Sequence, residues 1–139
     1  MIPDCEKIRE YIRTFSLVKE CDVIKNGDLR MATPFCYPNG SYIDLFLTKT
    51  NDLFDKYVLS DLGQTTDYVA DMQFNMWTTK KRRTRIDDIC ESLGVTQSDG
   101  QFRIYLTDED FRQIYNPIVR VSQACIRVAD LVFYSEIGK

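Results

Sequence analysis

Residues 21–50 read CDVIKNGDLRMATPFCYPNGSYIDLFLTKT, and this stretch decides the fold class. Asn-Gly occurs at residues 26–27 and again at residues 39–40, each time between two runs that contain apolar residues. Asn and Gly accept the positive φ angles of a type I′ turn, which joins neighbouring antiparallel strands. The stretch therefore predicts three antiparallel strands.

The alternation of side chains is clearest in the third of these strands, SYIDLFLT at residues 41–48. One face carries Ile43, Leu45 and Leu47, and the other carries Tyr42, Asp44 and Phe46. This period of two residues is typical of a strand with one buried face. A fourth strand is predicted in KYVLSDLG, residues 56–63, with Gly63 at its end.

The segments on either side of the strands show helical spacing. Residues 3–15 predict an opening amphipathic helix whose apolar positions are Cys5, Ile8, Ile12 and Phe15. Residues 64–74 predict a short helix, with Thr65 or Thr66 as its N-cap. A second short helix is predicted in residues 85–94, and it ends at Gly94. Ser-Asp-Gly at 98–100 then predicts a small hairpin.

The C-terminal third contains the longest helical pattern. Thr107 and Asp110 form a capping box, and apolar residues recur at steps of three and four from Phe111 to Val132. Pro117 predicts a kink or a break near residues 113–117, because proline cannot donate a helical hydrogen bond. A second apolar row widens the helix face, and its members are Val119, Ile126 and Phe133.

Two explanations of this wide apolar face stay open. The helix is buried between the sheet and the first helix, or it forms a homodimer or another protein interface. In either case the sequence predicts an α+β fold in a single domain over residues 1–139. The fold has an antiparallel sheet of four or more strands, an N-terminal helix, short central helices and a long, kinked C-terminal helix.

Composition narrows the classes of function. The chain has 139 residues, 44% of them hydrophobic and 28% charged, and a net charge of −3. No apolar run approaches the roughly 20 residues that a membrane span needs, and charged residues occupy the N-terminus. We therefore predict a cytoplasmic protein that does not contact a membrane, in a prokaryotic cell or a phage-infected host.

Histidine is absent, which excludes histidine-dependent catalysis and histidine-ligated zinc. The five cysteines have no CxxC spacing, so we predict reduced thiols that pack in the core, with no metal and no cofactor. Cys36 lies in a loop, but no histidine is available to activate its thiol. The sequence thus predicts a protein that is not an enzyme.

Four carboxylates are candidate metal ligands of a nuclease: Asp28, Asp44, Asp61 and Asp67. Such a nuclease needs a lysine two residues after its second acidic group, and Phe46 stands two residues after Asp44. Asp61 is instead predicted to accept backbone N–H bonds in the turn before Gly63. A metal-dependent nuclease remains the least favoured alternative.

The cationic segment TTKKRRTR, residues 78–85, is the strongest candidate site. It offers phosphate-binding cations, with Trp77 and the nearby Phe74 and Tyr68 able to stack on bases. The predicted binding residues are Lys80, Lys81, Arg82, Arg83, Arg85 and Trp77. Three alternatives stay open: contact with nucleic acid, contact with an acidic protein surface, or a solvated loop and first helical turn.

The order of motifs resembles a prokaryotic family, the domain-of-unknown-function family numbered eighteen twenty-eight. The matching segments run from ATPF and PNGSYIDLFLT through KYVLSDLGQTTDYV and KKRRTRIDDICESLGV to DGQFRIYL and QACIRVADLVF. YVLSDLGQT, residues 57–65, is the most specific part, although Leu62 replaces the usual second aspartate. The resemblance covers roughly residues 20–133.

The resemblance implies an α+β fold and a bacterial or phage genome, often near mobile elements. It implies no activity. We therefore predict a non-catalytic binding or regulatory module that acts through protein contacts in phage defence or counter-defence. A nucleic-acid-binding regulator that uses residues 80–85 is the alternative, followed by the nuclease.

Overall fold

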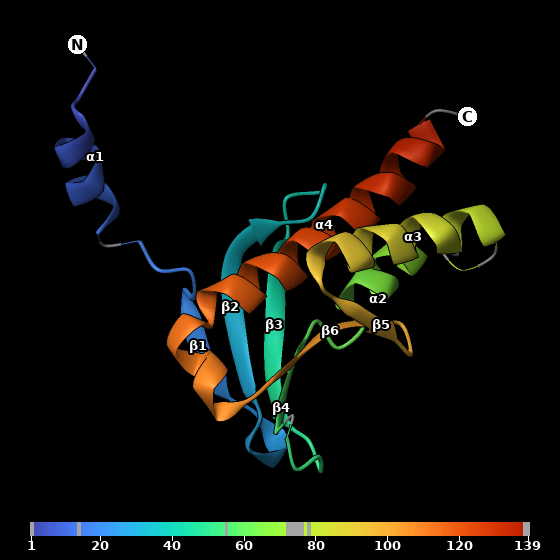
Figure 1. Ribbon diagram of the computed structural model, residues 1–139. Helices are drawn as coiled ribbons and strands as arrows, with labels where there is room; N and C mark the ends of the chain where they lie inside the picture. Colours follow the sequence, from blue (N-terminus) through green and yellow to red (C-terminus); the bar gives the residue numbers. More distant parts are fainter. Residues whose placement is uncertain (1, 14, 55, 72–76, 78, 138–139) are drawn as a thin grey trace.

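The computed structural model describes residues 2–13, 15–54, 56–71, 77 and 79–137 (Figure 1). In chain order the elements are α1 (Cys5–Ile12), β1 (Glu20–Val23), the 3₁₀ turn η1 (Lys25–Gly27), β2 (Leu29–Cys36), β3 (Tyr42–Lys49), β4 (Tyr57–Ser60), α2 (Gln64–Asp71), α3 (Lys80–Leu93), β5 (Thr96–Ser98), β6 (Gln101–Leu106), the 3₁₀ helix η2 (Asp108–Gln113) and α4 (Tyr115–Ile137).

The strands form one antiparallel sheet of six, in the order β1-β2-β3-β4-β6-β5. Helices α2, α3 and α4 lie on one face of this sheet (Figure 1). Side chains on β3 alternate accordingly: Ile43 and Leu45 are fully buried under the helices, whereas Tyr42 on the other face is 53% exposed. The predicted α+β fold is confirmed.

Two of the three predicted turns have the expected backbone. Asn26 and Gly27 have φ angles of 71° and 79°, and Asp99 and Gly100 have 53° and 75°. The turn before β3 differs, because only Gly40 has a positive φ angle. The N–H of Gly40 donates to the carbonyl of Tyr37 at 2.8 Å, so the turn begins at Tyr37 and type I′ was the wrong prediction there.

The N-terminus of α2 is not capped by a threonine as predicted. The carboxylate of Asp61 accepts the N–H of Thr65 at 3.0 Å. Both threonine hydroxyls are used elsewhere: Thr65 bonds the hydroxyl of Tyr37 at 2.8 Å, and Thr66 donates to the carbonyl of Gly100 at 2.7 Å. The predicted end of this helix lies outside the described residues.

The predicted break near Pro117 falls at Ile114, between η2 and α4. Asp110 accepts the N–H of Thr107 at 2.7 Å, as in a capping box, but the segment that follows is a 3₁₀ helix. Pro117 then lies in the first turn of α4, where a backbone N–H has no helical partner. Its missing donor therefore costs the helix nothing.

The wide apolar face of α4 is covered by the sheet on one side and by α2 and α3 on the other. Its buried residues are Ile118, Val121, Ala124, Cys125, Val128, Ala129 and Val132. The first helix takes no part, because α1 has no buried residue and stands apart from the sheet (Figure 1). Burial against the first helix was therefore a wrong prediction.

The cysteines divide into three groups. Cys90 and Cys125 are buried as free thiols in the core, as predicted, but Cys36 is half-buried and Cys5 and Cys21 are exposed. Within the described residues, no helix has the length and apolar composition needed to cross a membrane.

Candidate binding surfaces

On one face of the sheet, none of the described residues forms a covering helix, and we call this the open sheet face. Its central side chains are Arg30, Asp44, Phe46, Val58, Arg103 and Tyr105, which alternate along their strands with buried core residues. Direct cross-strand pairing sets Arg30, Phe46, Ser60 and Arg103 in one row and Thr48, Val58 and Tyr105 in the next. An aromatic and aliphatic centre thus lies between two arginines.

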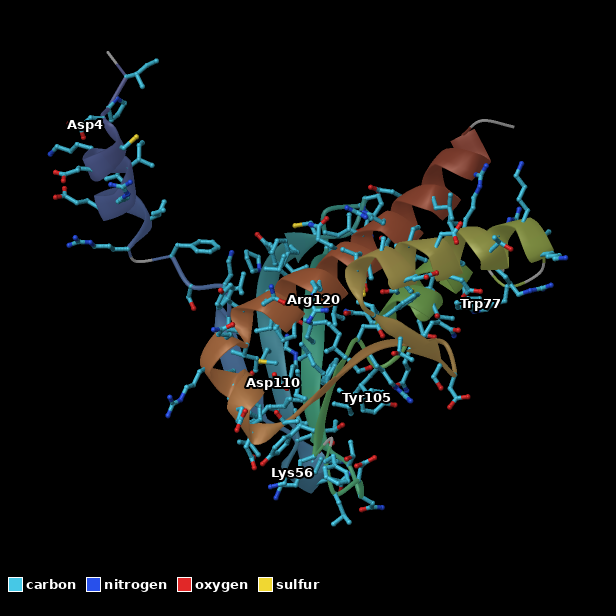
Figure 2. All side chains as sticks on the ribbon, in the orientation of Figure 1. Asp4, Lys56, Trp77, Tyr105, Asp110 and Arg120 are labelled. Atoms are coloured by element: carbon cyan, nitrogen blue, oxygen red, sulfur yellow. The ribbon has the colours of Figure 1, made fainter. Side chains whose placement is uncertain are left out.

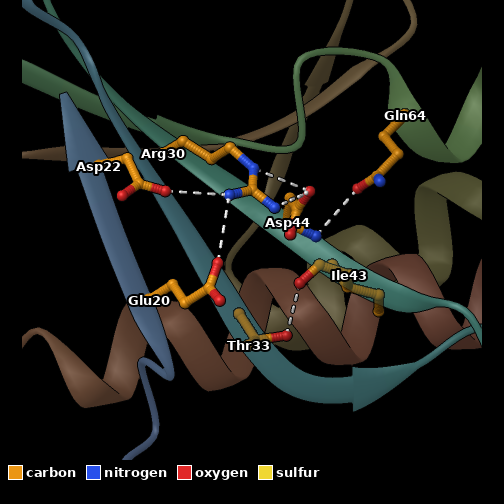
Figure 3. A network of polar contacts seen from close by, with 7 residues as sticks. All are labelled: Glu20, Asp22, Arg30, Thr33, Ile43, Asp44 and Gln64. Carbon is orange, nitrogen blue, oxygen red and sulfur yellow. Dashed lines mark hydrogen bonds and ion pairs between the residues drawn. The ribbon is translucent and has the colours of Figure 1, made fainter. Parts of the chain in front are cut away.

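Arg30 is held by three carboxylates at one side of this face (Figure 3). Its Nε and Nη2 both lie 3.1 Å from Asp44, its Nη1 lies 3.2 Å from Asp22, and Glu20 is 3.8 Å away. The charge of Asp44 is the main cause that raises the pKa of Arg30. Because β1, β2 and β3 each contribute, the network ties the edge strand to the middle of the sheet.

Arg103 is fixed on the other side of the face. Its Nε and Nη2 donate to the side-chain oxygen of Gln101 at 3.0 and 2.8 Å. Tyr105, two residues further along β6, is 42% exposed (Figure 2). The two arginines are therefore positioned by hydrogen bonds, while the ring of Tyr105 remains accessible from solvent.

The cationic residues form the first part of α3 rather than a loop. Thr79 caps this helix, since its hydroxyl accepts the N–H of Arg82 at 3.1 Å. Lys80, Lys81 and Arg85 are exposed and make no ion pair with any described residue. Lys81 and Arg85 stand four residues apart, so two like charges lie on the same solvent side of the helix.

The structure brings only part of the predicted cationic site together. The Nη1 of Arg83 donates to the backbone carbonyl of Trp77 at 2.7 Å, which links the tryptophan to the helix N-terminus (Figure 2). Tyr68 does not join them, because its ring stacks on Tyr37 at a centroid distance of 4.6 Å. Phe74 lies outside the described residues.

Asp61 and Gly63 form the turn between β4 and α2. The buried carboxylate of Asp61 accepts three backbone N–H groups: Gly63 at 3.1 Å, Thr65 at 3.0 Å and Phe102 at 3.0 Å. One side chain therefore ties the end of β4 to both α2 and β6. Gly63 has a φ angle of 82°, a conformation that glycine adopts without strain.

The four aspartates that are candidate metal ligands have separate roles or positions. Asp28 directly follows the 3₁₀ turn η1, and Asp44 pairs with Arg30. Asp61 is committed to backbone N–H groups, and Asp67 is exposed in the first turn of α2. Among the described residues, no group of three or more histidine, cysteine, aspartate or glutamate side chains is placed to hold a metal ion.

Sequence reasoning did not predict the open sheet face as a site. Alternation assigned Asp44 and Phe46 to the face opposite Ile43, and the same argument applied to β6 would have added Arg103 and Tyr105. The sequence pattern does not show which face of the sheet the helices cover. Only the packing of α2, α3 and α4 on a single face shows that the other face stays open.

A comparison with protein families matches residues 33–128 to "Domain of unknown function DUF1828". Comparisons with curated proteins and with solved structures give no match. The family match begins within β2 and ends within α4, so it contains β3 to β6, the Asp61 turn and the cationic helix. The chain belongs to the family of domains of unknown function DUF1828.

Proposed function

We propose that the protein is a non-catalytic binding module that engages a protein partner through the open sheet face. The observation that carries this proposal is the cluster of Phe46, Val58 and Tyr105 between Arg30 and Arg103, in which Phe46 and Val58 are half-buried and Tyr105 is exposed. Protein interfaces have an apolar centre with a polar rim, and they are enriched in tyrosine and arginine. The resemblance to a family from bacterial and phage genomes leads us to place this partner in phage defence or counter-defence.

Ordered polar groups around the cluster support this proposal. Arg30 and Arg103 are fixed by neighbouring side chains, so they lose little conformational freedom when a partner binds. The carboxylates of Glu20 and Asp22 stay more than half exposed beside Arg30. A partner with an apolar patch and both signs of charge at its rim fits this arrangement.

Tyr105→Ala is expected to weaken binding of the partner by about tenfold or more, because aromatic anchors at the centre of an interface carry much of its affinity. The partner would be captured from cells of the source organism on the immobilised chain, identified by mass spectrometry, purified and titrated by calorimetry. Tyr115→Ala is the matched control, since Tyr115 is an exposed tyrosine on the helix side of the sheet.

The titration distinguishes a partner that binds the open sheet face from a partner that binds the cationic first part of α3. Equal affinities of wild type and Tyr105→Ala would contradict the proposal. If binding were instead lost in Lys81→Glu/Arg85→Glu, the partner would be an acidic protein that contacts α3.

A nucleic-acid-binding regulator is the second candidate, and the like-charge pair Lys81 and Arg85 favours it. Like charges four residues apart destabilise a helix by about 0.2–0.5 kcal/mol, and cations near a helix N-terminus add a cost of similar size. Neither Lys81 nor Arg85 forms an ion pair with an acidic side chain among the described residues. Phosphate groups bound at this end of α3 would do so.

Contact with phosphates predicts that Lys81→Glu/Arg85→Glu reduces the slope of log affinity against log salt by about 2 for duplex DNA. Fluorescence anisotropy with a labelled duplex at several salt concentrations measures this slope. Lys25→Glu/Lys49→Glu changes the net charge equally at exposed positions away from α3 and should leave the slope unchanged. An identical loss in both variants would mean that only the overall charge matters.

A further inference from the structure

We propose that a pocket at the edge of β6 binds the C-terminal residue of an extended peptide, and that Arg120 pairs with the carboxylate of that residue. The pocket has a volume of about 130 Å³, and its apolar lining comes from Ile104, Leu106 and Pro117. Pockets for drug-sized ligands measure roughly 300–1,000 Å³, so only a short segment fits here. The proposal does not rest on the open sheet face, because the pocket lies on the side of the sheet that α4 covers.

The backbone of Tyr105 borders this pocket, since its ring points to the open sheet face. The carbonyl of Phe102 accepts the N–H of Asp61 at 3.4 Å, so the backbone groups of Phe102 point toward β4. Successive residues of an antiparallel strand alternate in the side to which their backbone groups point. The N–H and C=O of Tyr105 therefore point away from β4, toward the edge of the sheet.

Within the described residues, no strand reaches Tyr105 on that side. β5 pairs with β6 only as far as Thr96, which lies opposite Arg103. Continuing this register would set Gly94 opposite Tyr105, but the N–H of Gly94 donates to the carbonyl of Glu91 at 3.2 Å and ends α3. The N–H and C=O of Tyr105 are thus available to an added strand, which is a common way for a sheet edge to bind an extended peptide.

The guanidinium of Arg120 is fixed beside this gap. Its Nε donates to the side-chain oxygen of Asn116 at 2.8 Å, and its Nη1 donates to the carbonyl of Leu93 at 3.1 Å. Gly94 makes room for it, because a Cβ atom on Gly94 would lie 2.6 Å from Nη1. Nη2 makes no hydrogen bond or ion pair with a described residue. A guanidinium positioned in this way binds a carboxylate strongly.

The two ends of the pocket carry opposite charges. Arg120 lies at the Gly94 end. Asp110 lies at the other end, where its carboxylate accepts the N–H of Thr107 at 2.7 Å (both charged residues are labelled in Figure 2). A peptide antiparallel to β6 runs from the Thr107 end to the Gly94 end, so its C-terminus lies beside Arg120. The carboxylate of its last residue accepts the N–H of Tyr105 and pairs with Nη2, and the N–H of that residue donates to the C=O of Tyr105.

A free phosphate is a poorer occupant of this pocket. Arg120 is the one cation among the described lining residues, and Asp110 borders the same space. The carboxylate of Asp110 repels the second negative charge of a phosphate. The same repulsion disfavours a peptide of the opposite direction, whose carboxylate would lie beside Asp110.

The test is a titration of the ¹⁵N-labelled chain with the acetylated tripeptide Ala-Val-Ala, followed by nuclear magnetic resonance. Its valine would lie opposite Leu106, with the side chain on the apolar lining of the pocket. We expect saturable shifts of the amide signals of Tyr105 and its neighbours in β6. The same tripeptide with a C-terminal amide should bind at least about tenfold more weakly, because it loses the charge-assisted hydrogen bonds.

Arg120→Gln should remove this difference, so that the acid and the amide bind with similar affinity. A purely structural role of Arg120 would instead weaken both peptides alike and leave the ratio of their affinities unchanged. Arg127→Gln is the matched control, since Arg127 is an exposed arginine on the same helix. This control should keep the ratio of wild type.

Three results would overturn the proposal: no saturable shift with the acid peptide, equal binding of acid and amide to wild type, or an unchanged ratio in Arg120→Gln. The first two results use the wild-type chain alone, so they decide the matter even if Arg120→Gln fails to fold. Equal shifts with inorganic phosphate or with free alanine would also contradict the proposal, because they would assign the pocket to an anion or to an amino acid.

Discussion

Asp61→Ala is expected to lower the free energy of unfolding by about 3–5 kcal/mol, since a buried hydrogen-bonded charge is removed and its partners are left unpaired. The partners are the N–H groups of Gly63, Thr65 and Phe102, all within 3.1 Å of the carboxylate. They belong to the turn, to α2 and to β6, so no single neighbour can replace the carboxylate. Urea unfolding followed by circular dichroism measures the loss.

Asp61→Asn tests whether acceptor geometry or charge matters more. The amide retains one oxygen acceptor, so we expect a smaller loss than in Asp61→Ala. Asp67→Ala is the matched control, because Asp67 is an exposed aspartate on the adjacent helix. A change of less than about 0.5 kcal/mol in Asp61→Ala, the usual range of an exposed substitution, would contradict the assigned role.

Stability is expected to fall steeply as the pH rises above about 9, because three buried groups resist ionisation in the folded protein. Burial, followed by the charge of Asp87, raises the pKa of Cys90 from 9.0 to about 11. Burial also raises the pKa of Cys125 well above 9.0 and the pKa of Tyr37 above 10.0. Unfolding frees all three groups to release their protons.

The direction of the effect follows from proton binding. A raised pKa means that the folded state keeps its proton at a pH where the unfolded state has lost it, so stability is complete below the unfolded pKa. Cys90 alone contributes a loss of about 2 kcal/mol as pH rises from 9 to 11. Cys125 and Tyr37 extend the loss to higher pH.

Urea unfolding between pH 7 and 11 measures this dependence. Cys90→Ala and Tyr37→Phe should each flatten the alkaline decline, even if they also lower stability at pH 7. Cys5→Ala replaces an exposed thiol and serves as the matched control. A decline in the variants as steep as that of wild type would show that other groups cause it.

Local patterns predicted most of the fold because they depend on local chemistry. The Asn-Gly turns, the alternation in β3, the end of α3 at Gly94 and the long α4 all follow from turn preferences or periodicity. The errors arose where distant residues decide. Asp61 caps α2 in place of a threonine, and α4 packs on α2 and α3 in place of the first helix.

The candidate surfaces were predictable to different degrees. The cationic segment was visible because its charges are consecutive, yet its helical start at Lys80 depended on the Thr79 cap. The open sheet face was hidden because its members come from four strands, and only pairing sets Phe46 beside Ser60 and Arg103. Contacts between distant strands cannot be read from periodicity within each one.

The strand order also separates fast from slow steps in folding. Strands β1 to β4 pair with their neighbours in sequence, whereas β4 and β6 pair across about forty intervening residues. Closing such a loop costs entropy before its contacts form, which places the β4–β6 pairing late on the folding route. The hydrogen bond from the N–H of Phe102 to the carboxylate of Asp61 joins the two ends of this loop. Because it forms only when β4 and β6 pair, we expect it to slow unfolding more than it speeds folding.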